Sequence, residues 1–513
     1  MDYTQLQGFT WLDNTILVVY MLAVLAAGLY FSKKEMQGKE FFKGDGSVPW
    51  WVTCVSIFAT LLSPISFLAL AGNSYAGSWM LWFAQIGMII AIPLTIKFFL
   101  PVYAKLGIDT AYHYLELRYG SRALRVLGAL MFVIFQLGRM SIVMYLPCLA
   151  LAYLTDISVD VLIIAMGVIA IIYSYTGGLK AVLWTDFIQG VILIGGITLT
   201  LFYLIYSLDG GVSDVTRSLT TDGRFLMDSE KWFDWSNMLG TSVLLTLIGG
   251  GFTTFCSYVS SQDVVQRFTT TTDVKKLNKM TIGNGVLSIF AASVFYLVGT
   301  CLYLFYTQNP ELIAPDIVDR RDLVFAYFMT YQLPMGVTGI LLAALYAAAQ
   351  STLSTGINSV ATSWVLDIQS LITPDMDHKR QTKIAQYVSL GIGIFAIVVA
   401  MWLARSDVKS AYELFNSFLG LALGALAGIF VMGAFTRHTT AAGAFIGFVV
   451  SMLAVLYCKY CIPSINFWAY AIITIIITTL VGLLVSWVQK AATGREFTAP
   501  EGSTFWTARV KEQ

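Results

Sequence analysis

The 513-residue chain is 57% hydrophobic, only 12% charged, and carries a formal net charge of +1. Soluble domains hold roughly 25% charged residues, so this composition excludes a soluble globular protein. The near-zero net charge also excludes the basic surface that a nucleic-acid partner would require.

Apolar runs of about 20 residues follow one another along the chain, and each can span about 30 Å of hydrocarbon as a helix. Backbone groups in lipid must form hydrogen bonds within the segment, so such continuous runs predict helices rather than barrel strands. We predict an all-α polytopic membrane protein that forms one domain over residues 1–513. About thirteen transmembrane helices are expected, near residues 12–31, 50–73, 80–100, 123–151, 158–176, 180–206, 238–258, 279–306, 335–367, 384–404, 411–435, 440–458 and 466–489.

The first run is expected to be a retained helix, because Asp2 and Asp13 stand where a signal peptide needs basic residues. If the N-terminus lies outside, the inner loops hold most of the lysines and arginines, among them Arg267, Lys275 and Lys276. The positive-inside rule therefore predicts an outer N-terminus and an inner C-terminus, which requires an odd number of helices.

The predicted span 50–73 is interrupted near its middle by Pro64. Proline lacks an N–H and clashes with the carbonyl four residues earlier, here that of Thr60. Carbonyls between Ala59 and Leu62 are therefore expected to leave the helical ladder. A proline kink is common in membrane helices, so this feature alone does not define a site.

The span 238–258 contains Gly249-Gly250-Gly251 near its middle, followed by Thr253 and Thr254. We interpret it as a second broken helix, five segments after the first. Paired interruptions at corresponding positions of two halves are the best sequence pointer to a transporter site, and an odd repeat length inverts the second copy. The prediction is two inverted five-helix repeats, 50–206 and 238–435, with one extra helix at 12–31 and two at 440–489.

Arg139 lies near the middle of the predicted span 123–151. A buried charge in hydrocarbon is costly, so it is expected to face a partner or a wet cavity. None of the predicted spans places an acid at matching depth. The guanidinium fork suits a carboxylate, and we predict a substrate carboxylate as its partner; a structural ion pair is the alternative.

Asp186 lies about six residues, hence roughly 9 Å, inside the inner end of its helix. A carboxylate at that depth pairs with a cation or binds a proton. Lys180 is on the correct side to form a structural ion pair with it, and that alternative stays open.

In the span 335–367, Ser351, Ser354 and Thr355 stand at i, i+3 and i+4 and so share one helical face. Thr352 and the carbonyl of Ala348 border this face. Hydroxyls together with unwound carbonyls supply the oxygen ligands that a hard cation such as Na⁺ prefers. Packing between helices is the alternative role for these hydroxyls.

Two stretches resemble the signature of the sodium:solute symporter family, namely Tyr175-Thr176-Gly177-Gly178-Leu179 through Gln189 and Ala348-Ala349-Gln350-Ser351-Thr352 through Ser359. The similarity extends from about Lys33 to Arg437. Within the family the chain looks most like bacterial sialic acid symporters, through Ser56 to Thr60, Gln85, Gly138-Arg139, Val182 to Gly190 and Ser261 to Arg267. The resemblance implies a LeuT-type fold.

The resemblance also implies residue roles. Arg139 would bind the substrate carboxylate, and Gln85, Ser63 and Ser66 would contact the rest of the sugar acid. One Na⁺ site would use carbonyls of Ala59, Leu62 and Ala348 with hydroxyls of Ser351 and Thr352. A second would use Asp186, Ser351, Ser354 and Thr355. Leu61 and Thr254 occupy pocket positions where sialic acid symporters usually have a hydroxyl and an asparagine, and Pro64 replaces a small residue, so the sugar pocket is expected to differ.

By this resemblance the chain is a Na⁺-coupled symporter that imports a carboxylated solute, chiefly sialic acid (N-acetylneuraminate), across a bacterial inner membrane by alternating access. We expect two Na⁺ as coupling ions, a lipid bilayer and a small-molecule substrate as partners, and a monomer. Another solute (sugar, monocarboxylate or amino acid) and H⁺ coupling through Asp186 are the alternatives. An enzyme is not expected, because the spans hold no nucleophile–base pair or metal cluster.

Overall fold

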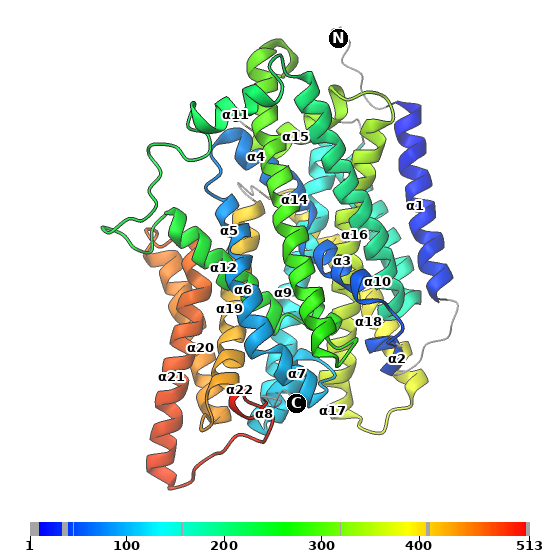
Figure 1. The fold of residues 1–513 in the computed structure, drawn as a ribbon. Helices are drawn as coiled ribbons and strands as arrows, with labels where there is room; N and C mark the ends of the chain where they lie inside the picture. Colours follow the sequence, from blue (N-terminus) through cyan, green and yellow to red (C-terminus); the bar gives the residue numbers. More distant parts are fainter. Residues whose placement is uncertain are drawn as a thin grey trace.

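The computed structural model describes residues 10–32, 39–44, 46–154, 157–318, 320–406 and 411–508, which form helices joined by loops (Figure 1). The helices of the first half are α1 (Trp11–Ser32), α2 (Lys39–Lys43), α3 (Trp50–Leu61), α4 (Pro64–Ala76), α5 (Trp82–Ile86), α6 (Met88–Phe98), α7 (Leu100–Leu106), α8 (Ala111–Tyr119), α9 (Arg122–Leu154), α10 (Val159–Ser207) and α11 (Val212–Thr220). Those of the second half are α12 (Val243–Ser260), α13 (Gln262–Phe268), α14 (Val274–Gln308), η1 (Pro310–Leu312), α15 (Arg321–Tyr331), α16 (Val337–Ser363), the π-helical η2 (Trp364–Gln369), α17 (Ser370–Ile372), α18 (His378–Leu403), α19 (Ala411–Phe435), α20 (Ala441–Cys461), η3 (Phe467–Ala469), α21 (Tyr470–Thr493) and α22 (Phe505–Ala508).

The membrane-spanning helices agree with the predicted apolar runs. Eleven helices of the described residues are long and apolar enough to cross a membrane, or twelve if α3 and α4 count as one span bent by 64°. The shorter apolar stretch Val159–Ile172 corresponds to the predicted span 158–176. It is continuous with the next span in α10, which is kinked at Gly178 (φ 54°). The total of thirteen stays a prediction.

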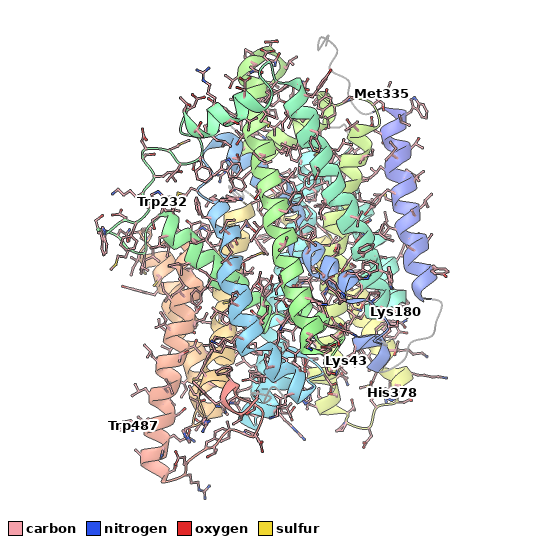
Figure 2. The ribbon with its side chains drawn as sticks, in the orientation of Figure 1. Lys43, Lys180, Trp232, Met335, His378 and Trp487 are labelled. Carbon is pink, nitrogen blue, oxygen red and sulfur yellow. The ribbon has the colours of Figure 1, made fainter. Side chains whose placement is uncertain are left out.

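The two ends of the described chain lie at opposite ends of the bundle. In Figure 1, α1 begins at the upper end and α22 lies at the lower end. Lys43, Lys180 and His378 lie toward the lower end, and Met335 lies at the upper end (Figure 2). Opposite ends are what an odd number of spans requires. That the lower end faces the cytoplasm stays a prediction from the positive-inside rule.

The break predicted at Pro64 is confirmed. Helix α3 ends at Leu61, α4 begins at Pro64, and both Leu62 and Ser63 have extended backbone conformations. Because Pro64 stands in the first turn of α4, its missing N–H costs no helical hydrogen bond. The carbonyl of Thr60 accepts a hydrogen bond from Arg139 Nη2 at 2.6 Å. The interruption therefore directs backbone oxygen toward a buried side chain.

The break predicted at Gly249-Gly250-Gly251 is wrong. Helix α12 runs unbroken through these glycines, and the interruption comes at Ser261, an extended residue between α12 and α13. The glycines instead allow a close helix crossing. A Cβ at Gly250 would lie 2.4 Å from the carbonyl oxygen of Ala84, and one at Gly251 would lie 2.7 Å from that of Gly87.

Substituting Gly250 by alanine is expected to destabilise the protein by about 1–3 kcal/mol, the usual cost of overpacking, because the new methyl group meets backbone that cannot rotate away. Gly195→Ala in α10 is the matched control, since a Cβ there meets no atom within 4 Å. Thermal unfolding of the two purified variants, followed by tryptophan fluorescence, measures the difference. Equal melting temperatures would contradict the close crossing.

Candidate functional site

Four buried charged side chains form a connected network at the centre of the bundle. Arg139 of α9 forms an ion pair with Asp263 of α13. Arg267, one turn further along α13, forms an ion pair with Asp186 of α10 at 2.7 Å. Arg267 also donates through Nη1 to the backbone carbonyl of Asp263. The two pairs are thereby joined into one chain of alternating charge.

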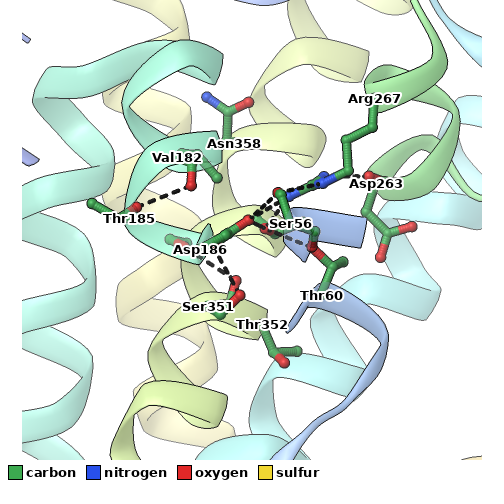
Figure 3. Close-up of polar contacts among 12 residues, drawn as sticks. Ser56, Thr60, Val182, Thr185, Asp186, Asp263, Arg267, Ser351, Thr352 and Asn358 are labelled. Carbon is green, nitrogen blue, oxygen red and sulfur yellow. Dashed lines mark hydrogen bonds and ion pairs between the residues drawn. The ribbon is translucent and has the colours of Figure 1, made fainter. Parts of the chain in front are cut away.

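Asp186 lies among hydroxyl groups from two other helices (Figure 3). Its Oδ2 accepts from Ser56 of α3 at 2.7 Å and from Thr355 of α16 at 3.3 Å. Its Oδ1 accepts from Ser351 of α16 at 2.8 Å. Asp186, Ser351 and Thr355 therefore meet at one place, as predicted for a cation site.

A structural ion pair of Asp186 with Lys180 was the alternative to a cation site, and the ion pair that the structure shows is with a different residue. The partner is Arg267, whose Nη2 donates to Asp186 and, at 2.7 Å, to Thr355. Lys180 lies toward the lower end of the molecule (Figure 2). Sequence proximity favoured Lys180. Hydropathy places Arg267 in an inner loop, because the polar residues after 258 are not typical of a membrane span.

The same misassignment hid the partner of Arg139. We predicted no acid at matching depth, yet Asp263 contacts its Nη1. Asp263 belongs to the short helix α13 after the break at Ser261. Since hydropathy ended that span at 258, the second part of the broken helix was not counted. The residues Ser261 to Arg267 resemble the same segment of sialic acid symporters, and this resemblance was the sequence signal for a functional role of Asp263.

A cavity lies directly beside the Arg139–Asp263 pair. It holds about 750 Å³ of space not filled by atoms, and this figure includes open solvent. Five of the six predicted substrate residues line it, namely Leu61, Ser66, Gln85, Arg139 and Thr254. Ser63 is buried but is not among the lining residues.

Other residues of the cavity wall were not predicted. Acidic and polar groups come from Asp263, Ser257, Thr253, Ser261 and Asn416, and apolar contacts come from Phe135, Phe415, Leu419 and Trp468. The mixture of aromatic surface, hydroxyls, one guanidinium and one carboxylate suits a polar solute with charged groups. Phe415, Asn416 and Leu419 belong to α19. The resemblance had not assigned a substrate contact to this helix.

The oxygens predicted for the first Na⁺ site come from the last turn of α3, from Leu62 in the break that follows it, and from α16. The Thr352 hydroxyl donates to the Ala348 carbonyl at 3.0 Å. The hydroxyls of Thr60 and Thr355 lie 3.3 Å apart, which brings the end of α3 against α16. For the second site, the Ser354 hydroxyl donates to the Ser351 carbonyl of its own helix at 3.1 Å. An all-oxygen donor set of this kind fits a hard cation.

Comparison with known proteins places the chain in one family. The profile described as "sodium:solute symporter family" matches residues 41–451. The chain is 33% identical over 470 residues to the sodium/sialic acid symporter SiaT of Proteus mirabilis, covering 91% of this chain and 93% of that protein. It is 32% identical over 479 residues to the sodium/sialic acid symporter NanT of Aliivibrio fischeri, covering 93% of each.

Solved structures agree with the sequence comparison. The substrate-bound outward-open structure of a Na⁺-coupled sialic acid symporter matches with a TM-score of 0.86 at 31% identity, over 93% of this chain and 98% of that one. Mhp1, a nucleobase-cation-symport-1 family transporter, matches with a TM-score of 0.57 at 15% identity, over 87% of this chain and 93% of that one, which shows the fold alone. The predicted LeuT-type fold is confirmed. On both grounds, this chain belongs to the sodium:solute symporter family.

Proposed function

We propose that the protein is a Na⁺-coupled symporter that imports sialic acid, with N-acetylneuraminate as the reference substrate. The observation that carries this proposal is the cavity that contains Arg139 and is connected to the Asp186 cluster through Asp263 and Arg267. The proposed sites for the solute anion and for the coupling cation thus belong to one network of contacting residues. The names of the relatives SiaT and NanT support sialic acid as the solute.

Arg139 is the proposed anchor for the substrate carboxylate. Its Nε has no hydrogen-bond partner among the described residues, although it is buried. A carboxylate in the cavity would supply acceptors to this free donor and to the Nη groups. Gln85, Ser66 and Thr254 are proposed to contact the hydroxyl and acetamido groups, with Leu61 packing against the ring.

Two Na⁺ are the proposed co-transported ions. The first would be held by the carbonyls of Ala59, Leu62 and Ala348 with the hydroxyls of Ser351 and Thr352. The second would be held by Asp186, Ser351, Ser354 and Thr355. Two Na⁺ with one anion carry a net charge of +1, so an inside-negative potential would drive uptake by about 2.3 kcal/mol per 100 mV.

The proposed architecture around these sites is a single transmembrane domain, monomeric, in a bacterial inner membrane with the N-terminus outside. The first repeat covers 50–206 and the second covers 238–435. The helix at 12–31 and the two at 440–489 lie outside the repeats. Sodium would bind from outside, the substrate would follow, and the segments around the two breaks would close over it.

A second candidate substrate class is amino acids. The carboxylate of Asp263 lines the same cavity as the guanidinium of Arg139. A zwitterion presents a carboxylate and an ammonium group at short separation. Arg139 would attract the carboxylate and Asp263 would attract the ammonium group, because each pair has opposite charges. Competition by an amino-acid panel against N-acetylneuraminate binding separates the two candidates.

Calorimetric binding to the purified protein tests the proposal. N-acetylneuraminate is expected to bind in NaCl and far more weakly in equimolar KCl. Its methyl ester, which lacks the charge, is expected to bind about 100-fold more weakly in NaCl, since a charged pair lost from a buried site costs about 2–5 kcal/mol. Equal affinity for acid and ester would contradict the role of Arg139. Saturable binding of an amino acid alone would support the second candidate.

A further inference from the structure

The network around the cavity contains two cations and two anions in alternating order. Arg139, Asp263, Arg267 and Asp186 follow one another, each in contact with the next. All four are buried. The set is electrically neutral as it stands.

Other buried charges of the described chain belong to separate clusters. Asp13 accepts from backbone N–H groups of Gly336 and Gly339, Arg118 donates to carbonyls of Gly433 and Thr436, and Arg125 pairs with Asp367 and Glu116. Within the described residues, the four charges therefore compensate mainly one another.

A neutral buried set has a direct consequence for binding. Sodium added at Asp186 alone leaves one uncompensated positive charge, and a carboxylate added at Arg139 alone leaves one uncompensated negative charge. An uncompensated charge in a buried site is strongly unfavourable. Sodium and a carboxylate added together restore neutrality, so each favours the other.

We infer that Asp263 is the residue that couples Na⁺ binding at Asp186 to binding of the substrate carboxylate at Arg139. This inference rests on the proposed function and adds its coupling element. Asp263 contacts both arginines, through its carboxylate to Arg139 and through its backbone carbonyl to Arg267. It also lines the cavity.

The positions on α13 allow an exchange of partners. Asp263 and Arg267 stand at i and i+4 of one helix, a spacing at which side chains meet. Sodium at Asp186 replaces Arg267 as the cation there, and Arg267 is then free to pair with the carboxylate of Asp263. Arg139 loses its internal partner and accepts the substrate carboxylate. Without Na⁺, Asp263 occupies Arg139 and substrate binding is weak.

Asp263→Asn tests this role, because the variant keeps the shape and removes one negative charge. The set then carries +1, and a carboxylate neutralises it without Na⁺. The coupling factor is the affinity for N-acetylneuraminate in NaCl divided by that in equimolar KCl, measured by calorimetry on the purified full chain. Coupling between sites is typically about 5–150-fold, and we expect this factor to fall at least about fivefold in the variant, chiefly because affinity in KCl rises.

Two further variants separate coupling from a structural effect. Asp263→Asn combined with Arg267→Gln leaves Arg139 and Asp186 as a neutral set but removes both side chains that exchange partners, so the coupling factor is expected to stay as low as in Asp263→Asn. Asp160→Asn is the matched control, because Asp160 pairs with the exposed Arg405 away from the cavity; its coupling factor should not change. If the single variant does not fold, the double variant still decides the matter, since a coupling factor within about twofold of that of the unaltered protein would overturn the inference.

The outcomes distinguish the inference from the proposed function. If the unaltered protein binds N-acetylneuraminate in a Na⁺-dependent way and Asp263→Asn keeps the coupling factor within about twofold, the charge-compensation role is overturned. If the unaltered protein does not bind this solute, the substrate proposal fails. The inference is then tested by Na⁺ alone: the rise in melting temperature with NaCl should be smaller in Asp263→Asn, and an equal rise would overturn it.

Discussion

Replacing Arg139 by glutamine is expected to weaken N-acetylneuraminate binding in saturating Na⁺ by about 100-fold or more. The substitution removes the cation that faces the substrate carboxylate, and truncating one partner of a buried charge pair costs about 2–5 kcal/mol. The affinity for the neutral methyl ester should change little. Calorimetry with acid and ester as paired ligands measures both effects on the same preparation.

The same substitution leaves Asp263 buried without its partner. Breaking a buried ion pair typically destabilises a protein by about 3–5 kcal/mol. Loss of binding by Arg139→Gln alone would therefore not distinguish a lost substrate contact from a destabilised fold. Arg139→Gln combined with Asp263→Asn removes both charges and is expected to melt close to the unaltered protein. Strong binding of the acid by this double variant would contradict the anchoring role of Arg139.

Removing Asp186 is expected to abolish one of two Na⁺ sites. In the combination Asp186→Asn with Arg267→Gln, both members of the 2.7 Å ion pair become neutral, so the fold is preserved while the only anionic ligand proposed for Na⁺ is lost. With two sites the Na⁺ dependence of uptake has a Hill coefficient of up to about two, and with one site it cannot exceed about one. Uptake rate against Na⁺ concentration in proteoliposomes gives this number.

The outcome for Asp186 also addresses the alternative of H⁺ coupling. If Asp186 carried a proton instead of ligating Na⁺, the double variant would keep its Hill coefficient for Na⁺ and lose its response to a pH gradient. Ser351→Ala is a useful companion, since the Ser351 hydroxyl donates to Asp186 at 2.8 Å and is proposed as a ligand in both Na⁺ sites. It is expected to lower Na⁺ affinity without removing either arginine pair.

Much of the fold was predictable because long apolar runs and specific motifs act locally. The run lengths predicted the helices, and Pro64 predicted the α3–α4 break correctly because proline acts on its own helix. Gly249 to Gly251 were misinterpreted, since glycine permits either unwinding or close packing. Which of the two occurs depends on the helix that packs against it, and residues such as Ala84 are distant in sequence.

The part of the candidate site that could be predicted is the set of residues whose roles the family resemblance implies. Arg139, Gln85 and Thr254 do line one cavity. Asp263 and Arg267 were missed because a hydropathy window treats the polar residues after a break as a loop, although α13 is buried inside the bundle. The depth of a residue cannot be read from hydropathy once a span is broken. A buried ion pair between distant segments, such as Asp186 with Arg267, leaves no local pattern.

Uptake of labelled N-acetylneuraminate into proteoliposomes tests the central claim most directly. We expect saturable accumulation with an inward Na⁺ gradient, further stimulation by an inside-negative potential because the co-transported charge is positive, and none with K⁺ in place of Na⁺. Accumulation that ignores Na⁺, or that follows a pH gradient alone, would contradict Na⁺ coupling. Absence of uptake by a protein that Na⁺ still stabilises against heat would contradict sialic acid as the substrate.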